Sequence, residues 1–224
     1  ALSAQRYRGA GKLMRYPYAE ILVMARAPVA GAAKTRLIPA LGEAGAATLH
    51  GYLVERLLTE LSEAAIAPIT LCCTPDTTHP FFIHCSDHYG VSLQQQQGED
   101  LGERLHYALG QALQHKRSAL VIGCDIPQLG AEDIIAAFEA LEQGREAAVS
   151  PTAGGGDALL GVRQPAAGLF RGVEWGSEGV MAQTRQRLSE LGWRWQELRE
   201  QWDVDRPEDL QQLRRLQLPP QIAE

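Results

Sequence analysis

A short stretch near the amino-terminal part of the sequence carries three cations among small residues. Arg26, Lys34 and Arg36 lie in a loop that follows an apolar run. Small residues let backbone N–H groups approach a ligand, while guanidinium and ammonium groups bind phosphate. The loop is not a Walker A motif, because two alanines separate Gly31 from Lys34. Taken alone, the pattern fits a phosphate site and a solvated basic turn about equally well.

Two acidic segments could complement that loop. Asp125 follows an apolar run, and the later segment holds Asp203 and Asp205. Mg²⁺ bound to phosphates needs only one or two protein carboxylates, so these acids suffice for a metal site. In an extended segment, Asp203 and Asp205 would point to the same face. Asp205 and Glu208 also fit a helix capping box with Pro207 in the first turn, and the two readings are compatible.

These side chains must be positioned by strands that alternate with helices. Such alternation predicts a mostly parallel sheet covered on both faces, with ligands at the carboxyl ends of its strands. Asp100 and Glu103 are predicted to form a capping box. The apolar runs predict strands at residues 20–25, 69–73, 91–95, 119–123, 147–151, 158–162, 193–198 and 202–204. Helical spacing is expected at residues 43–65, 79–89, 100–115, 131–143, 179–191 and 207–216.

Length and composition restrict the class of protein. The 224 residues, 45% of them hydrophobic, fit one domain, which we place at 19–224 after a flexible or loosely docked arm at 1–18. No apolar run approaches the roughly 20 residues that span a bilayer, and the arm lacks a secretory apolar region. The net charge of −6 disfavours nucleic acid as a partner. Four cysteines without a C-x-x-C pair indicate reduced thiols and a cytoplasmic location. The oligomeric state is not indicated.

The motifs, in their order, resemble those of a known family. The chain is similar to the DUF2064 family of GT-A-fold transferases, also called rSAM/selenodomain-associated transferases. It is more distantly similar to phospholactate and molybdenum-cofactor guanylyltransferases. The resemblance is carried by MARAPVAGAAKTRLIPALG from Met24, GEDLGERL from Gly98, IGCDIPQL from Ile122, LLGVRQP from Leu159, EWGSEGVMAQT from Glu174 and DVDRPEDL from Asp203.

The resemblance implies a fold and a set of roles. The fold would be a three-layer α/β, Rossmann-like GT-A fold with a mostly parallel mixed sheet. Nucleotide would be bound by Ala25, Arg26, Gly31, Lys34, Arg36, Gly98, Asp100 and Gly102. Catalysis would depend on Arg26, Lys34 and Asp125. Mg²⁺ or Mn²⁺ would be held by Asp125 and Asp205, with Asp203 contributing. Trp175 and Ser177 would lie on the acceptor side.

One segment departs from the family pattern. Relatives carry Pro-Ala-x-Asp-Gly-Gly-Tyr, whereas this chain reads Pro-Thr-Ala-Gly-Gly-Gly-Asp from Pro151. Gly154 therefore stands at the acidic position and Asp157 at the tyrosine position. Either a ligand-binding acid is missing or Asp157 replaces it, so Asp157 joins the substrate-binding candidates.

Three functions follow as hypotheses. The first is Mg²⁺-dependent nucleotidyl transfer from an NTP to a small phosphorylated acceptor, favoured because three cations suit a triphosphate. The second is glycosyl transfer from a sugar nucleotide. The third is nucleotide binding with reduced or no catalysis, which Gly154 favours.

A zinc site is a weaker alternative. His84 and His88 are four residues apart, with Cys85 and His79 nearby, and this spacing can hold zinc. A surface helix with scattered histidines explains the same pattern.

Overall fold

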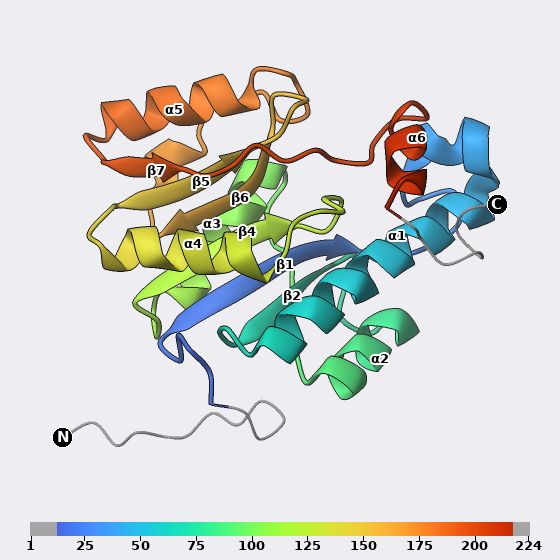
Figure 1. Cartoon of the computed structure of the whole chain (residues 1–224), viewed down its shortest axis with the longest axis horizontal. Coiled ribbons are helices and arrows are strands. Elements are labelled where there is room, and N and C mark those ends of the chain that lie inside the picture. The colour runs from blue at the N-terminus through green and yellow to red at the C-terminus, as the bar shows by residue number, and fades with distance from the viewer. Residues whose placement is uncertain (1–12, 217–224) are drawn as a thin grey trace.

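One mixed sheet of seven strands forms the centre of the molecule, whose residues 13–216 are described by a computed structural model (Figure 1). The strand order is β3-β2-β1-β4-β6-β5-β7, and only β6 runs antiparallel to its neighbours. The strands are β1 (Ala19–Arg26), β2 (Ile69–Thr74), β3 (Ser92–Gln95), β4 (Ser118–Gly123), β5 (Ala147–Pro151), β6 (Asp157–Val162) and β7 (Trp195–Glu197). The predicted α/β class and mostly parallel sheet are confirmed.

Helices cover both faces of the sheet, which makes three layers. One face packs against α1 (Ile38–Ala64), α2 (Pro80–Tyr89) and α4 (Ala131–Glu142). The other face packs against α3 (Leu101–Ala112) and α5 (Val180–Glu190), with the 3₁₀ turn η2 (Ala167–Leu169) beside them. In β1, Ile21 and Val23 face the first core while Leu22 faces the second, so the strand is apolar throughout.

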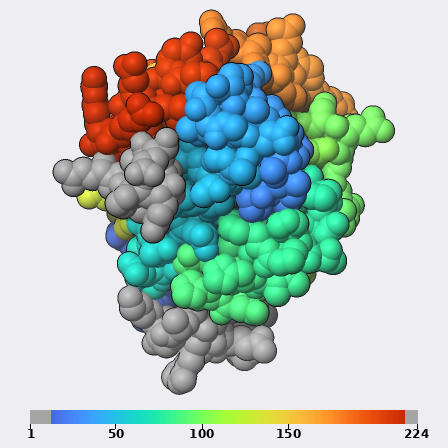
Figure 2. Space-filling view, turned by 90° about the vertical axis from the view of Figure 1, so that its right-hand side faces the viewer, coloured from blue at the N-terminus to red at the C-terminus, as the bar shows by residue number. Residues whose placement is uncertain are grey.

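A third, smaller core lies beyond the carboxyl edge of the sheet. It joins the 3₁₀ turn η1 (Thr35–Leu37) and the start of α1 to α6 (Asp209–Arg214). Leu37, Leu53, Trp202 and Val204 are buried together there. Figure 2 shows the red carboxyl-terminal segment lying against the blue start of α1. This packing brings the second acidic segment next to the basic loop.

Three local predictions need correction. The segment 202–204 is not a strand of the sheet, and only Gln201 forms an isolated bridge there, to Thr152. Asp205 does not cap α6, because the Asp209 carboxylate instead accepts hydrogen bonds from Asp205 N at 2.9 Å and Arg206 N at 2.7 Å. The long first helix begins at Ile38, five residues before the predicted start, and Gly42 interrupts it with a φ of 70°.

The capping box predicted at α3 is half formed. Asp100 Oδ1 accepts from Glu103 N at 2.8 Å, as expected. The Glu103 carboxylate accepts from Glu99 N at 2.8 Å, one residue before the expected partner. Asp100 therefore fixes the start of α3.

Residues 13–18 of the predicted arm are docked against the domain. Arg15 N and Tyr16 N donate to the carbonyls of Ala65 and Ile66, and the buried Tyr16 ring packs against Phe138. Residues 1–12 lie outside the described part, so the arm remains a prediction. Within the described residues, the search for a helix long and apolar enough to cross a membrane finds none.

Candidate functional site

A pocket of about 480 Å³ opens at the carboxyl edge of the parallel strands. It brings together the predicted Arg26, Lys34, Arg36, Asp125 and Asp205, which come from three distant segments. We call it the basic pocket, and its other lining residues are Met24, Ala32, Ala33, Thr35, His50 and Cys124. Ligands of such sheets bind at this edge, so the position agrees with the sequence-based expectation.

Lys34 lies at the centre of the basic pocket. Its side chain is only 5% exposed, and its Nζ donates to Asp125 Oδ1 at 2.9 Å and to the Val204 carbonyl at 2.5 Å. The Lys34 backbone is left-handed, with a φ of 47°. A residue other than glycine is strained in that conformation, and such strained residues cluster at functional sites. Lys34 therefore links the basic loop to both acidic segments.

Asp125 is an ionised carboxylate that pairs with Lys34 and lies beside His50. Burial by itself raises its pKa, but the Lys34 ammonium and the His50 ring outweigh that effect and hold the pKa below its usual range. Its side chain keeps 46% of its surface exposed toward the pocket. A charged, half-exposed carboxylate facing a pocket can accept a metal ion in place of Lys34.

His50, on α1, is a site residue that the sequence did not single out. Its Nε2 lies 2.8 Å from the Arg26 carbonyl, and its buried Nδ1 lies 3.7 Å from Asp125 Oδ1 without a hydrogen-bond partner in the described structure. Because a carbonyl only accepts, Nε2 carries a proton. The sequence does contain a signal for this position. Leu53 and Val54 follow His50 by three and four residues, which places His50 on the buried face of the helix.

The other acids form a cluster beside Asp125. Asp205 pairs with Arg36. The pKa of Asp203 is raised by burial and then by the negative charges of Asp205, Asp209 and Asp125. A Cβ built on Gly154 would lie 3.6 Å from Asp203 Oδ1. An acid at the Gly154 position would thus lie next to Asp203, in an already negative region.

A second, apolar pocket of about 110 Å³ adjoins the first, and Met24 lines both. We call it the Asp157 pocket. Burial raises the pKa of Asp157 to about 6. The remaining lining residues are Leu101, Leu105, Val121, Ile122, Gly123, Ala158, Leu159 and Leu160.

The predicted nucleoside and acceptor residues lie around the start of α3. Gly102 packs against Trp175 so closely that a Cβ there would lie 2.7 Å from the indole Nε1. The Gly98 carbonyl accepts from Arg104 Nε at 3.0 Å, and Asp100 is used as the helix cap. Ser177 Oγ accepts from Gly179 N at 3.2 Å, so it shapes the turn before α5. The structure joins Gly102 to Trp175 but places neither in the basic pocket.

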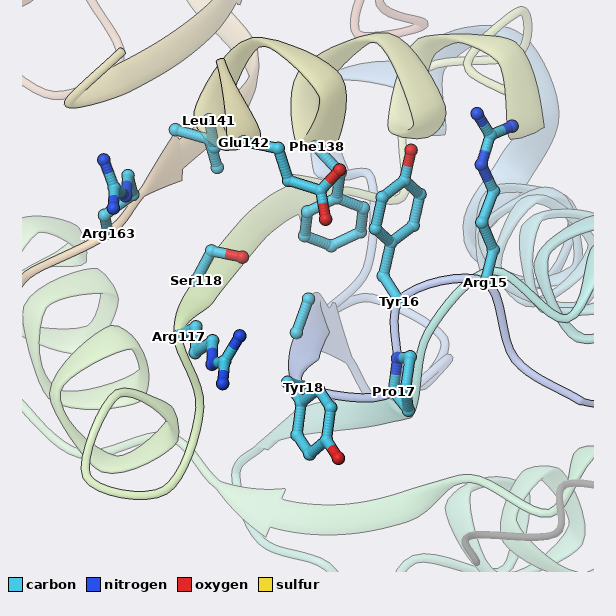
Figure 3. Close-up of a pocket in the computed structure, with 11 residues that line it drawn as sticks. Arg15, Tyr16, Pro17, Tyr18, Arg117, Ser118, Phe138, Leu141, Glu142 and Arg163 are labelled. Carbon is cyan, nitrogen blue, oxygen red and sulfur yellow. The ribbon is translucent and has the colours of Figure 1, made fainter. Parts of the chain in front are cut away.

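A larger pocket of about 560 Å³ lies at the opposite, amino edge of the sheet (Figure 3). Arg15, Arg117 and Arg163 surround it, with Glu142 between them and the Arg117 guanidinium 5.0 Å from the Tyr18 ring centroid. It holds none of the predicted site residues. Size alone therefore does not mark the functional pocket, and the basic pocket is the better candidate.

The histidines of α2 do not form a metal site. His84 and His88 stack with ring centroids 5.5 Å apart, and His84 pairs with Glu55. Cys85 is buried in the core. Within the described residues, the one cluster of metal-ligand type comprises His50, Cys124 and Asp125, in the basic pocket.

Comparison with known proteins agrees with this geometry. The model of a family of uncharacterised proteins conserved in bacteria, DUF2064, matches residues 57–177, which are 121 of the 224 residues. The chain belongs to the DUF2064 family. No curated protein sequence matches this DUF2064 member.

Solved structures share the fold of this DUF2064 member. A protein from Desulfovibrio desulfuricans G20, provisionally named a nucleotide-diphospho-sugar transferase, is 28% identical over 91% of this chain and 89% of its own, with a TM-score of 0.82. The 4-diphosphocytidyl-2C-methyl-D-erythritol synthase of Anaerococcus prevotii DSM 20548 is 9% identical over 90% and 99%, with a TM-score of 0.60. The inositol-1-phosphate CTP transferase of T. maritima is 13% identical over 88% and 91%, with a TM-score of 0.55. The DUF2064 chain thus has a transferase fold.

Proposed function

We propose that this protein is a Mg²⁺-dependent transferase with a nucleotide donor, and that it transfers a nucleotidyl group from an NTP to a small acceptor. The observation that carries the proposal is the basic pocket, where Arg26, Lys34 and Arg36 surround Asp125 and Asp205. The named relatives of this fold include a CTP transferase, which supports a nucleotide as the ligand.

The cations of the basic pocket would bind the donor phosphates. Lys34 would exchange the Asp125 carboxylate for a phosphate oxygen, while Arg26 and Arg36 offer planar, bidentate donors. In nucleotidyl transfer, an acceptor oxygen forms a bond to the α-phosphorus as the bond to the bridging oxygen breaks and pyrophosphate leaves. Fixed positive charge around the phosphates stabilises the negative charge that develops there.

The acids of the pocket fit a divalent cation. Asp125 and Asp205 would be its protein ligands, with Asp203 beside them, and Mn²⁺ could replace Mg²⁺. Burial, and after it the charges of the neighbouring carboxylates, raise the pKa of Asp203, and a cation would relieve the repulsion among these carboxylates. When bound, Mg²⁺ would neutralise phosphate charge and fix the orientation of the phosphates.

The remaining predicted contacts follow from this placement of the phosphates. Gly98, Asp100 and Gly102, at the start of α3, would lie beside the nucleoside. Trp175 and Ser177 would lie toward the acceptor.

The four cysteines are free and buried, which supports the expected cytoplasmic location.

Binding of nucleotides in the presence of Mg²⁺ tests the proposal. A thermal-shift panel of NTPs and sugar nucleotides should give a rise in melting temperature with one class, because ligands that bind the folded state stabilise it. Lys34→Ala and Asp125→Ala should abolish that rise. Arg117→Ala, at the opposite edge of the sheet, is the matched control and should retain it. Absence of any stabilisation in the wild type would refute the proposal.

Glycosyl transfer from a sugar nucleotide is the second candidate, and the Asp157 pocket is compatible with it. An isolated carboxyl beside the phosphate site suits an acceptor hydroxyl. Release of pyrophosphate would identify nucleotidyl transfer, whereas release of a nucleoside diphosphate would identify glycosyl transfer. Binding without either product would favour the third hypothesis, a nucleotide-binding protein with little catalysis.

A further inference from the structure

The Asp157 pocket combines one carboxyl group with apolar walls. Among its lining residues, which come from β1, α3, β4 and β6, Asp157 is the only one that titrates or carries charge. Met24 separates this pocket from the basic pocket and lines both. A group held by Asp157 would therefore lie in a pocket that adjoins the proposed phosphate site.

The reversed direction of β6 explains why Asp157 reaches this edge. β6 is antiparallel to β4, so its first residue, rather than its last, lies at the carboxyl end of the parallel strands. The preceding glycine run makes this possible. A Cβ on Gly155 would lie 2.0 Å from the Glu178 carbonyl oxygen, so only glycine allows the loop to pass there.

Asp157 has no compensating partner. Its carboxyl accepts from its own backbone N–H, and no side-chain cation or hydroxyl pairs with it in the described part of the chain. A half-buried carboxyl without a partner among apolar side chains costs free energy, and its position in a pocket makes it a candidate for a function. Burial raises its pKa to about 6, so at neutral pH it is ionised and still basic enough to take a proton.

We propose that Asp157 is the general base of the transfer and that the accepting group is an uncharged hydroxyl, not a phosphate. The inference rests on the proposed nucleotide transfer and deepens it by naming the acceptor class, which replaces the phosphorylated acceptor expected from the sequence. The Asp157 carboxylate takes the hydroxyl proton as the oxygen forms its bond to the donor. The donor bond to the leaving phosphate then breaks, and that phosphate carries away the electron pair.

The pocket disfavours an anionic nucleophile. Its lining residues include no cation, and a phosphate beside ionised Asp157 would meet a like charge among apolar side chains. A hydroxyl on an apolar or neutral carbon skeleton fits both the walls and the carboxylate. The same step serves nucleotidyl and glycosyl transfer.

Donor breakdown with small probes tests the proposal without knowledge of the natural acceptor. The donor identified by thermal shift is incubated with Mg²⁺ and, separately, with water alone, glycerol or inorganic phosphate. Products are separated by chromatography between pH 5 and 8. The full chain is compared with Asp157→Asn, Asp157→Ala and a control, Asp87→Asn, on the exposed surface of α2.

We expect transfer to water or glycerol, with a rate that rises through pH 6. Asp157→Asn and Asp157→Ala should lower that rate by about 10²-fold or more and abolish the rise, since general bases contribute 10²–10⁴-fold. Donor affinity should change less than about twofold, and Asp87→Asn should match the wild type.

Equal rates in the wild type and both Asp157 variants, including no turnover in any, would overturn the inference. Transfer to inorganic phosphate that persists in Asp157→Asn would also overturn it. In both cases retained donor binding leaves the proposed nucleotide site intact. Failure of the wild type to bind any donor would instead refute the proposed function, and the inference with it.

Discussion

Replacing Lys34 by methionine separates two roles that the structure gives this side chain. The substitution removes the ammonium group but keeps the length of the side chain. Lys34 is 5% exposed, and its Nζ contacts Asp125 Oδ1 at 2.9 Å and the Val204 carbonyl at 2.5 Å. Both contacts are lost in Lys34→Met, and the left-handed backbone remains.

The loss of stability can be worked out from these contacts. A hydrogen bond to a charged group contributes about 1.5–3 kcal/mol. The ion pair adds no more than about 1 kcal/mol, because Asp125 is 46% exposed and solvent screens it. We expect a total of about 1.5–4 kcal/mol, or a drop of about 3–16 °C in melting temperature.

The sign of the pH dependence follows from Asp125. Its folded pKa lies below the unfolded value of about 3.9. Such a group stabilises the fold above the unfolded pKa, and the contribution is lost as the pH falls through the folded pKa. The difference between Lys34→Met and the wild type should therefore be complete at pH 7 and shrink below about pH 4.

Ligand binding gives the sharper readout. Without the ammonium, Mg²⁺ no longer competes with Lys34 for Asp125, so Mg²⁺ alone should bind Lys34→Met at least as tightly as the wild type. Nucleotide with Mg²⁺ should bind about 10-fold or more weakly, because a phosphate contact is lost. Calorimetric titrations of both ligands measure this. Unchanged nucleotide affinity, or weaker binding of Mg²⁺ alone, would refute the assignment of Lys34.

Three further outcomes are expected. Gly155→Ala should lower the free energy of unfolding measured in urea by about 3 kcal/mol, because the new Cβ would meet the Glu178 carbonyl. Gly144→Ala is the control: in the described structure nothing beyond its chain neighbours lies within 4 Å of a Cβ there, so it should cost only about 1 kcal/mol. Asp157→Asn should stabilise the protein by up to about 2 kcal/mol at pH 8. The reason is that the folded-state pKa of Asp157 is raised, so this carboxyl costs stability as the pH rises from about 4 through 6. Equal melting temperatures of variant and wild type at pH 8 would contradict this. EDTA should abolish the stabilisation by nucleotide, and retention of the full thermal shift would argue against a metal.

The positions of the main site residues could be predicted because they depend on local sequence and one general rule. Arg26, Lys34 and Arg36 lie in a loop directly after a strand, and Asp125 follows another strand. Parallel strands bring their carboxyl ends to one edge, so the rule alone places these residues together.

Other features depend on contacts between distant segments and could not be predicted. Asp205 pairs with Arg36 from a distant loop, while Asp209 accepts hydrogen bonds from the backbone before α6, and the local sequence does not specify which acid does which. His50 joins the site through the Arg26 carbonyl, and a backbone acceptor leaves no trace in the sequence. The sequence named Asp157 as a candidate, but its position at the carboxyl edge of the sheet depends on the direction of β6, which alternating apolar residues do not specify.

The third core also makes the geometry of the basic pocket depend on a segment outside the sheet. Trp202, Val204 and Asp205 follow every strand of the sheet in the chain, yet the backbone of Val204 binds both Asp125 and Lys34. The packing of Trp202 and Val204 against the start of α1 therefore fixes the distance between the basic loop and both acidic segments. A change in this small core can disturb the pocket while the sheet itself stays intact.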